Sequence, residues 1–105
     1  MATKLQLQVW KKLKEIPKGK VTTYKLLAKS INTKAVRAVA SAVAKNPYAP
    51  KVPCHRVVLS NGKVGEYTHP EGKDRKIKLL QNEGIIIKGE KILNFKDVLY
   101  NFNAQ

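Results

Sequence analysis

Hydrophobic residues recur at helical spacing near the start of the chain. The spacing predicts a first helix over residues 4–16, which Pro17 and Gly19 end. We expect Trp10, which lies on this helix, to belong to the core. The apolar face of the helix carries Leu5, Val9, Leu13 and Ile16.

A β-branched stretch over residues 21–24 predicts a short extended link after this helix. Thr23 is placed to cap a second, short helix that begins at Tyr24, because a threonine oxygen accepts a hydrogen bond from the first helical turn. A turn over residues 31–33 then ends the second helix.

The third predicted helix, over residues 34–45, has unusually small side chains. Its surface is almost all Ala and Val, and Arg37 is the large cation of its first turns. Asn32 or Thr33 is expected to cap it. Two short helices joined by a tight turn are typical of a helix-turn-helix, although any three-helix bundle has the same spacing.

The second half of the chain predicts short strands and further helix. Three prolines between residues 46 and 53 predict a rigid loop. A strand over residues 57–59, a turn over 60–63 and a return at Val64 predict a hairpin wing. The remaining predicted elements are a helix over 73–82 ended by Gly84, a second hairpin over 85–93 and a helical turn over 97–102.

These elements define the expected fold class as mainly α (α+β). We predict a winged helix-turn-helix with a three-helix core, a small β-hairpin wing and a further C-terminal helix. Because 105 residues close one core but cannot be divided between two, we expect a single domain over residues 1–105.

The charge of the chain indicates a polyanionic partner. Lys and Arg number 21 against 7 Asp and Glu, which gives a formal net charge of +14. Phosphates offset such self-repulsion, so nucleic acid is the favoured partner, and a lysine-rich solvated surface is the alternative. No stretch approaches the roughly 20 apolar residues of a spanning helix, and no signal-peptide core is present, so we expect no membrane association.

The cysteine content limits the chemistry of the chain. One cysteine cannot form an internal disulfide, and one Cys with two His is a poor set for a closed zinc site, so we expect no metal and an intracellular location, in cytoplasm, nucleoid or nucleus. Cys54 is therefore either a small buried hydrophobe or a reactive thiol.

The segment Pro53-Cys54-His55-Arg56-Val57-Val58 favours the reactive alternative. An adjacent imidazole and guanidinium lower the cost of forming a thiolate. Neighbouring side chains in an extended segment point to opposite sides, so the thiol and the imidazole either touch directly or are joined by a bridging water. Glu83 is the candidate acid that orients His55, because it ends a helix that must pack on the core.

Several motifs together resemble the O6-alkylguanine-DNA alkyltransferases. The resemblance covers about residues 5–88 and is most specific in the Pro53–Val58 block with Asn46 eight positions before the cysteine. The other matching segments are Val21-Thr-Thr-Tyr24, Lys34-Ala-Val-Arg37-Ala-Val, Gly65-Glu-Tyr67-Thr68 and Leu79-Leu80-Gln-Asn-Glu83-Gly84.

The resemblance implies a monomer, free of cofactors, that enters the minor groove of double-stranded DNA and flips an alkylated guanine into a pocket. Cys54 would take the alkyl group, His55 would help deprotonate the thiol, Tyr24 would protonate or hydrogen-bond the leaving guanine, and Asn46 would brace the active-site loop. The implied DNA contacts are Thr23, Lys34, Arg37 as the wedge, Ala38, Ala40 and Ser41. The implied pocket residues are Val43, Val57, Tyr67 and Thr68.

The small side chains of the third helix agree with this placement, because they keep the helix slim enough for a minor groove only about 6 Å wide. The alternative is that they pack against another helix.

Two departures keep other functions open. Because the sequence begins almost at the DNA-binding domain, we expect this chain to lack the N-terminal domain usual in the family. Residues 69–75, with His69 expected at the surface, resemble instead the alkyltransferase-like proteins. Those bind alkylated guanine without repairing it and carry tryptophan where this chain has Cys54. A non-catalytic lesion sensor that recruits excision repair and a general basic DNA-binding module are therefore the alternatives to a single-turnover transferase.

Overall fold

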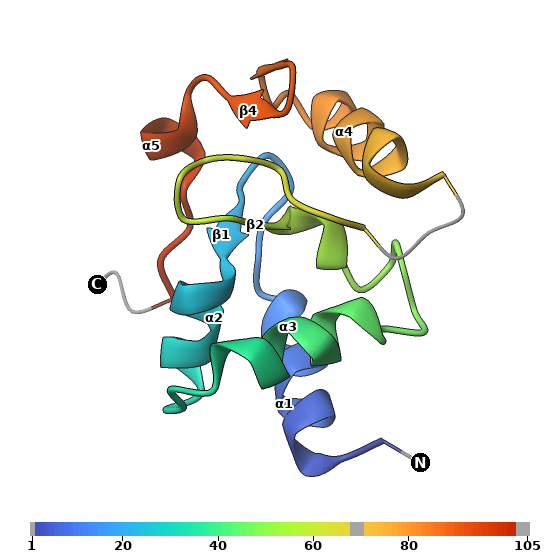
Figure 1. Cartoon of the computed structure of the whole chain (residues 1–105), viewed down its shortest axis with the longest axis vertical. Coiled ribbons are helices and arrows are strands. Elements are labelled where there is room, and N and C mark those ends of the chain that lie inside the picture. Colours follow the sequence, from blue (N-terminus) through green and yellow to red (C-terminus); the bar gives the residue numbers. More distant parts are fainter. Residues whose placement is uncertain (1, 68–70, 103–105) are drawn as a thin grey trace.

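The computed structural model describes residues 2–67 and 71–102. Three helices lie in the lower half of Figure 1, and a fourth helix with a hairpin lies in the upper half. The lower helices are α1 (Lys4–Leu13), α2 (Tyr24–Ser30) and α3 (Val36–Ala44). The upper elements are α4 (Gly72–Asn82), β3 (Ile87–Lys88), β4 (Lys91–Ile92) and α5 (Phe95–Val98).

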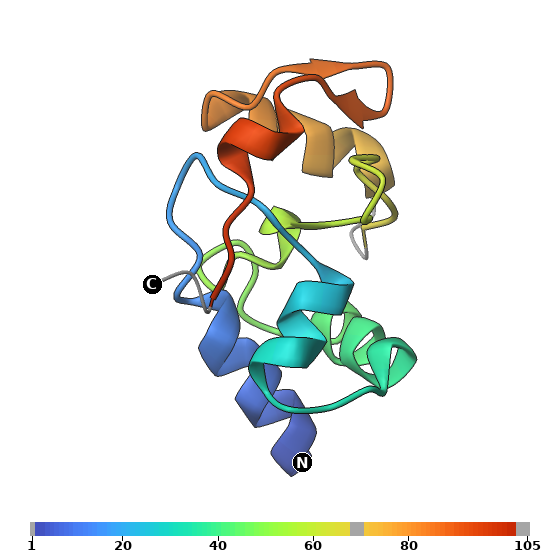
Figure 2. The ribbon, with the colours of Figure 1, turned by 90° about the vertical axis from the view of Figure 1, so that its left-hand side faces the viewer.

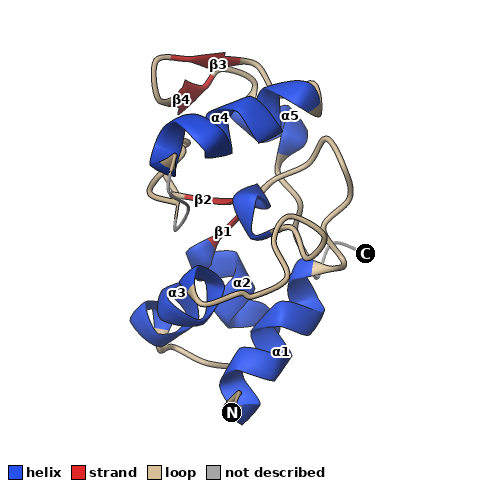
Figure 3. Cartoon of the chain, turned by 90° about the vertical axis from the view of Figure 1, so that its right-hand side faces the viewer, coloured by secondary structure: helices blue, strands red, loops and turns tan. Residues whose placement is uncertain are grey.

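A small parallel pair of strands lies between the two halves, as Figure 3 shows. It joins β1 (Thr22–Thr23) to β2 (Val57–Val58), and the 3-10 turn η1 (Cys54–Arg56) leads directly into β2. Figure 2 shows that the segment after α5 returns past this pair toward the lower helices. The expected class, mainly helical with small β elements, is confirmed.

The first two helices begin close to their predicted positions. Thr3 and Gln6 form a reciprocal capping box at the start of α1. Thr23 caps α2 as predicted, since its hydroxyl accepts a hydrogen bond from Leu26 N at 3.1 Å. The first helix ends at Leu13, three residues earlier than predicted. Ahead of Pro17 the backbone forms a tighter turn, in which Ile16 N donates a hydrogen bond to Leu13 O at 3.2 Å.

The predicted cap of the third helix is wrong. The helix begins at Val36 with Ala35 as its N-cap, and no side chain caps it. The hydroxyl of Thr33 accepts a bond from Ala35 N at 3.1 Å inside the turn, and Asn32 adopts a φ of 57° there. Both polar residues therefore build the turn itself.

The predicted wing pairs differently from a hairpin. The turn over residues 60–63 forms, with Leu59 N bonded to Lys63 O at 2.9 Å, but β2 pairs with β1 and not with Val64. Val64 N donates to Glu90 O at 2.8 Å, which joins the returning chain to the second hairpin. That hairpin is confirmed, as is α4, whereas the last helical turn lies at 95–98 and not at 97–102.

The core consists of two apolar clusters on opposite sides of β2. Successive side chains of a strand point to opposite faces, so Val57 packs below with the three helices and Val58 packs above with α4 and the hairpin. The lower cluster includes Trp10, as predicted, whose indole Nε1 donates to Ala42 O at 2.8 Å and ties α1 to α3. Cys54 also belongs to the lower cluster.

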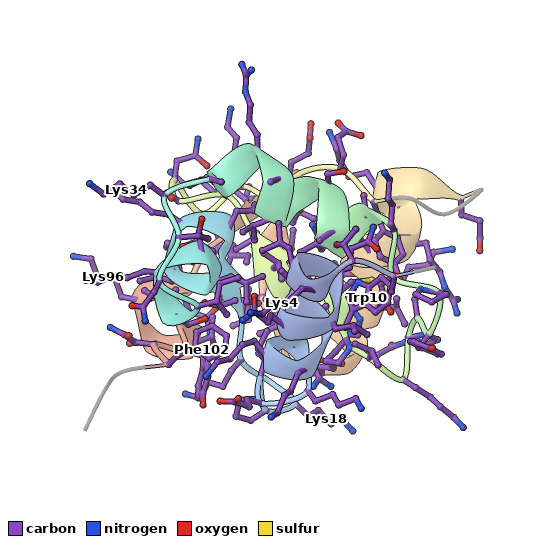
Figure 4. The ribbon with its side chains drawn as sticks, turned by 90° about the horizontal axis from the view of Figure 1, so that it is seen from below. Lys4, Trp10, Lys18, Lys34, Lys96 and Phe102 are labelled. Atoms are coloured by element: carbon purple, nitrogen blue, oxygen red, sulfur yellow. The ribbon has the colours of Figure 1, made fainter. Side chains whose placement is uncertain are left out.

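Lysines project from the surface on several sides of the molecule. Lys18, Lys34 and Lys96 point outward at the edges of the view in Figure 4, and all three are exposed. Within residues 2–67 and 71–102, no helix combines the length and the apolar character needed to cross a membrane.

Replacing Trp10 tests the tie between the helices. We expect Trp10→Phe to lower the free energy of unfolding by about 1–3 kcal/mol, because it shrinks a buried side chain and leaves the Ala42 carbonyl without its donor. Urea denaturation measures the loss. The exposed Leu7→Ala on the same helix is the control and should change stability by less than about 0.5 kcal/mol; equal losses in both variants would contradict the tie.

Candidate active site

Cys54 begins η1 at the junction between the rigid loop and β2. Its residue is only 7% exposed, yet it borders a cavity of about 210 Å³ that opens between α3 and the loops. The thiol is therefore part of the core on one side and reachable on the other. The cavity is lined by Tyr24, Ala40, Val43, Ala44, Asn46, Ala49, Cys54, Glu66 and Tyr67.

Asn46 holds the loop that precedes the cysteine. Its amide Nδ2 donates to Val52 O at 2.7 Å, and its Oδ1 accepts from Tyr48 N at 3.0 Å. The Asn46 side chain thus forms hydrogen bonds with backbone groups at both ends of the loop, whose prolines have no N–H to donate. This arrangement fixes the backbone that leads into Cys54.

His55 lies almost fully buried beside a carboxylate. Its Nε2 is 2.8 Å from Glu83 Oε2, and Glu83 also accepts two hydrogen bonds from Arg56, at 2.9 and 2.8 Å. Burial alone would raise the pKa of Glu83, but the hydrogen bonds from Arg56 and His55 outweigh it and lower that pKa. Glu83 is therefore ionised at neutral pH.

The same contacts select the form of the imidazole. Burial lowers the pKa of His55 below its ordinary value of 6.5, against the opposing hydrogen bond to Glu83, so the ring is neutral near pH 7. A neutral ring that donates from Nε2 to Glu83 leaves Nδ1 as an acceptor. Nδ1 is buried and has no hydrogen-bond partner among the described residues.

Two tyrosines flank the thiol. Burial, reinforced by the nearby Cys54, raises the pKa of both Tyr24 and Tyr67 to about 12. Cys54 Sγ lies 4.0 Å from the Tyr67 hydroxyl oxygen. Both hydroxyls keep their protons at neutral pH and are able to donate hydrogen bonds.

Lys76 is a charged residue of the site that the sequence reasoning missed. It is 1% exposed, its Nζ donates to Glu66 O at 3.2 Å, and the same atom lies 5.9 Å from the centre of the Tyr24 ring. Burial lowers the pKa of Lys76 to about 8, although Cys54 and Glu66 oppose that shift. The available signal was its position four residues before Leu80, on the inward face of α4.

Most of the residues predicted to contact DNA lie on or beside α3, but one of them is buried elsewhere. Lys34, Arg37, Ala38 and Ser41 are exposed on or beside α3, and Ala40 borders the cavity. Thr23 does not reach this surface, because its side chain is buried as the cap of α2.

Some of the predicted pocket residues line the cavity and others do not. Val43 and Tyr67 line the cavity. Val57 is fully buried in β2 and does not line it. Thr68 and His69 lie outside the described residues.

The fold and the site together define a helix-turn-helix protein with a cavity-facing cysteine and an adjacent histidine bonded to a glutamate. The family model of the 6-O-methylguanine DNA methyltransferase DNA-binding domain matches residues 4–85. The chain belongs to this family.

Two curated proteins of similar sequence are methyltransferases by name. A methylated-DNA–protein-cysteine methyltransferase of Methanosarcina acetivorans is 51% identical over 78% of this chain and 52% of its own length. The methyltransferase of the same name from Candida glabrata is 41% identical over 90% of this chain and 45% of its own length. The chain thus spans about half the length of these curated relatives.

Two solved structures of protein–DNA complexes are also similar to this chain. Mycobacterium tuberculosis OGT in complex with DNA has a TM-score of 0.74 and 42% identity, over 79% of this chain and 51% of that chain. S. pombe Atl1 in complex with damaged DNA containing O6-carboxymethylguanine has a TM-score of 0.82 and 29% identity, and the match covers 96% of this chain and 99% of that chain.

Replacing the buried lysine tests its electrostatic cost. Lowering the pKa of a lysine from 10.5 to about 8 corresponds to roughly 3 kcal/mol of destabilisation at neutral pH. The loss of the bond to Glu66 O offsets part of this, so we expect Lys76→Met to raise the free energy of unfolding at pH 7 by about 1–3 kcal/mol.

The pH dependence gives a second measurement of the same effect. Between pH 8 and 10.5 the unfolded chain binds more protons at Lys76 than the folded chain, so this group makes stability rise with pH. Denaturation across this range should show that rise in the wild type and in the exposed-lysine control Lys78→Met, but not in Lys76→Met. A Lys76→Met protein that is less stable at pH 7 and keeps the rise would refute the assignment.

Proposed function

We propose that this chain transfers the alkyl group of an O6-alkylguanine in DNA to Cys54 in a single turnover. The observation that carries the proposal is the placement of Cys54, whose thiol borders a cavity while the neighbouring histidine is kept neutral by burial and oriented by its contact with Glu83. The established family supports this function, and so do the names of the curated relatives.

The proposed step exchanges one bond for another. The thiol proton passes to His55 Nδ1, directly or through a water, and the sulfur forms a bond to the alkyl carbon as the carbon–O6 bond breaks. The electron pair of that bond stays on the guanine. The Tyr24 hydroxyl donates its proton to the guanine ring and regains one from His55, so the net result is the transfer of one proton from the thiol to the released base.

The product explains why one turnover is expected. The sulfur ends as a thioether, and the sequence contains no second cysteine to displace the alkyl group. No cofactor enters the proposed step, because the thiol itself is the acceptor. The alkylated chain is then the final product.

DNA is expected to approach over α3. The small side chains of Ala38 and Ser41 permit close contact with a minor groove. Arg37 borders a second cavity, of about 320 Å³, which shares Tyr24 and Ala40 with the reactive one. A nucleotide turned out of the duplex would therefore pass Arg37 on its way to Cys54. The guanidinium of Arg37 can then fill the gap that the nucleotide leaves in the base stack of the DNA.

We further propose that the chain acts as an intracellular monomer on double-stranded DNA. The formal net charge of +14 suits a phosphate backbone, and a reduced compartment keeps the cysteine free.

A lesion sensor is the second candidate function. It is favoured by the likeness to S. pombe Atl1, which covers 99% of that chain at a TM-score of 0.82. A sensor would bind the damaged base without changing it. The presence of a sulfur atom at the cavity favours transfer instead.

A labelled duplex separates these functions. We expect incubation with DNA carrying labelled O6-methylguanine to move the label to the protein, and Cys54→Ala to abolish the transfer while it retains lesion binding. Mass spectrometry should place the mass gain on the peptide with Cys54. Selective binding without transfer would support the sensor, and equal binding to undamaged duplex would support a general DNA-binding module.

Removing the histidine tests its part in the chemistry. We expect His55→Ala to slow transfer by roughly 10²- to 10⁴-fold and to change lesion affinity little. Because burial lowers the pKa of His55, the wild-type rate should fall only as the pH drops below 6.5, and this acid limb should disappear in the variant. The matched control is His69→Ala, which removes the other histidine. Equal losses of rate and affinity would argue against a general base.

A further inference from the structure

The mouth of the reactive cavity carries an acidic side chain, which is unexpected in so basic a chain. Asp and Glu together number 7 of 105 residues. Among the described residues that line the cavity, Glu66 is the single carboxylate. Its side chain is 89% exposed, so it lies at the solvent end of the cavity.

Helix α4 holds this glutamate in place from two sides. The buried Lys76 donates to the Glu66 carbonyl oxygen at 3.2 Å, and Lys73 Nζ lies 3.4 Å from the Glu66 carboxylate. Lys73 is shared with Glu90, with which it also forms a hydrogen bond. One ammonium therefore faces two carboxylates, and the negative charge of Glu66 is only partly compensated.

The field of this carboxylate reaches the interior of the cavity. The pKa of Tyr24 is raised to about 12 mainly by burial, and the charges at Cys54 and Glu66 add to the effect. Glu66 likewise opposes the lowering of the pKa of Lys76. A negative charge brought next to Cys54 would meet the same field.

We propose that Glu66 is a specificity-determining residue that disfavours O6 adducts ending in a carboxylate relative to neutral alkyl adducts. This inference rests on the proposed function, because it concerns the group that the cavity admits. A neutral group such as methyl pays no electrostatic penalty beside Glu66. An O6-carboxymethyl group places a second anion in the same small cavity, where the two like charges repel.

The experiment compares two lesions in one duplex sequence. Duplexes carrying O6-methylguanine or O6-carboxymethylguanine are mixed with the full chain, and the two single-turnover rates are measured as mass gain at Cys54. We expect Glu66→Gln to raise the carboxymethyl-to-methyl rate ratio by about 2- to 5-fold, which is the size of a like-charge repulsion between exposed groups that water screens. Taking a ratio cancels the affinity that both duplexes share.

Glu15→Gln is the matched control. It removes the same charge from an exposed residue just after α1 that does not line the cavity, and should leave the ratio unchanged. A ratio that does not move in Glu66→Gln, or that moves equally in both variants, would overturn the proposal.

A second readout separates this proposal from the transfer reaction. In a Cys54→Ala background, the relative affinity for the two duplexes should shift in the same direction when Glu66→Gln is added. If the wild type transfers neither group but this affinity ratio shifts, the transferase function fails and the selectivity of Glu66 stands. If transfer occurs and neither ratio shifts, the selectivity fails alone.

Discussion

The carboxylate of Glu83 connects parts of the chain that the two apolar clusters leave separate. It lies at the end of α4 and accepts hydrogen bonds from both His55 and Arg56 of η1. Arg56 in turn donates to Ile16 O at 2.7 Å, just beyond α1. Because β2 places its two valines in different clusters, this network is one of the polar links between the two clusters. The orientation of the imidazole is therefore a consequence of how the halves are joined.

Burial and hydrogen-bonded partners together set the protonation states of the ionisable groups around the thiol. Glu83 stays ionised because the hydrogen bonds from Arg56 and His55 outweigh the effect of burial on its pKa, and His55 stays neutral because burial disfavours its charged form. Lys76 is held in the interior at an energetic cost, and its ammonium donates a hydrogen bond to Glu66 O at the cavity. Such costs are tolerated where a site needs fixed groups, and here they surround a single cysteine.

The sequence predicts the features that depend on local patterns and fails where partners are distant. The cap at Thr23 and the inward position of Trp10 follow from residue type and spacing. The pairing of β2 with β1 does not, because these strands are about 35 residues apart and two residues long each, so no periodicity marks them. Lys76 was overlooked since a lysine is ordinarily assigned to the solvent face. The family resemblance supplied the candidate residues, but not the burial of Thr23 and Val57.

The two interpretations of Cys54, as a core residue or as a reactive thiol, are compatible in this fold. The residue packs within the lower cluster and is almost inaccessible to bulk solvent, yet its thiol borders the cavity beside α3. A sulfur placed so deeply cannot reach out to a base stacked in a duplex, since its backbone is fixed by η1 and by the loop that Asn46 braces. The base must instead come to the sulfur. The proposed transfer therefore requires extrusion of the nucleotide, because of the position of the thiol and independently of how the DNA is recognised.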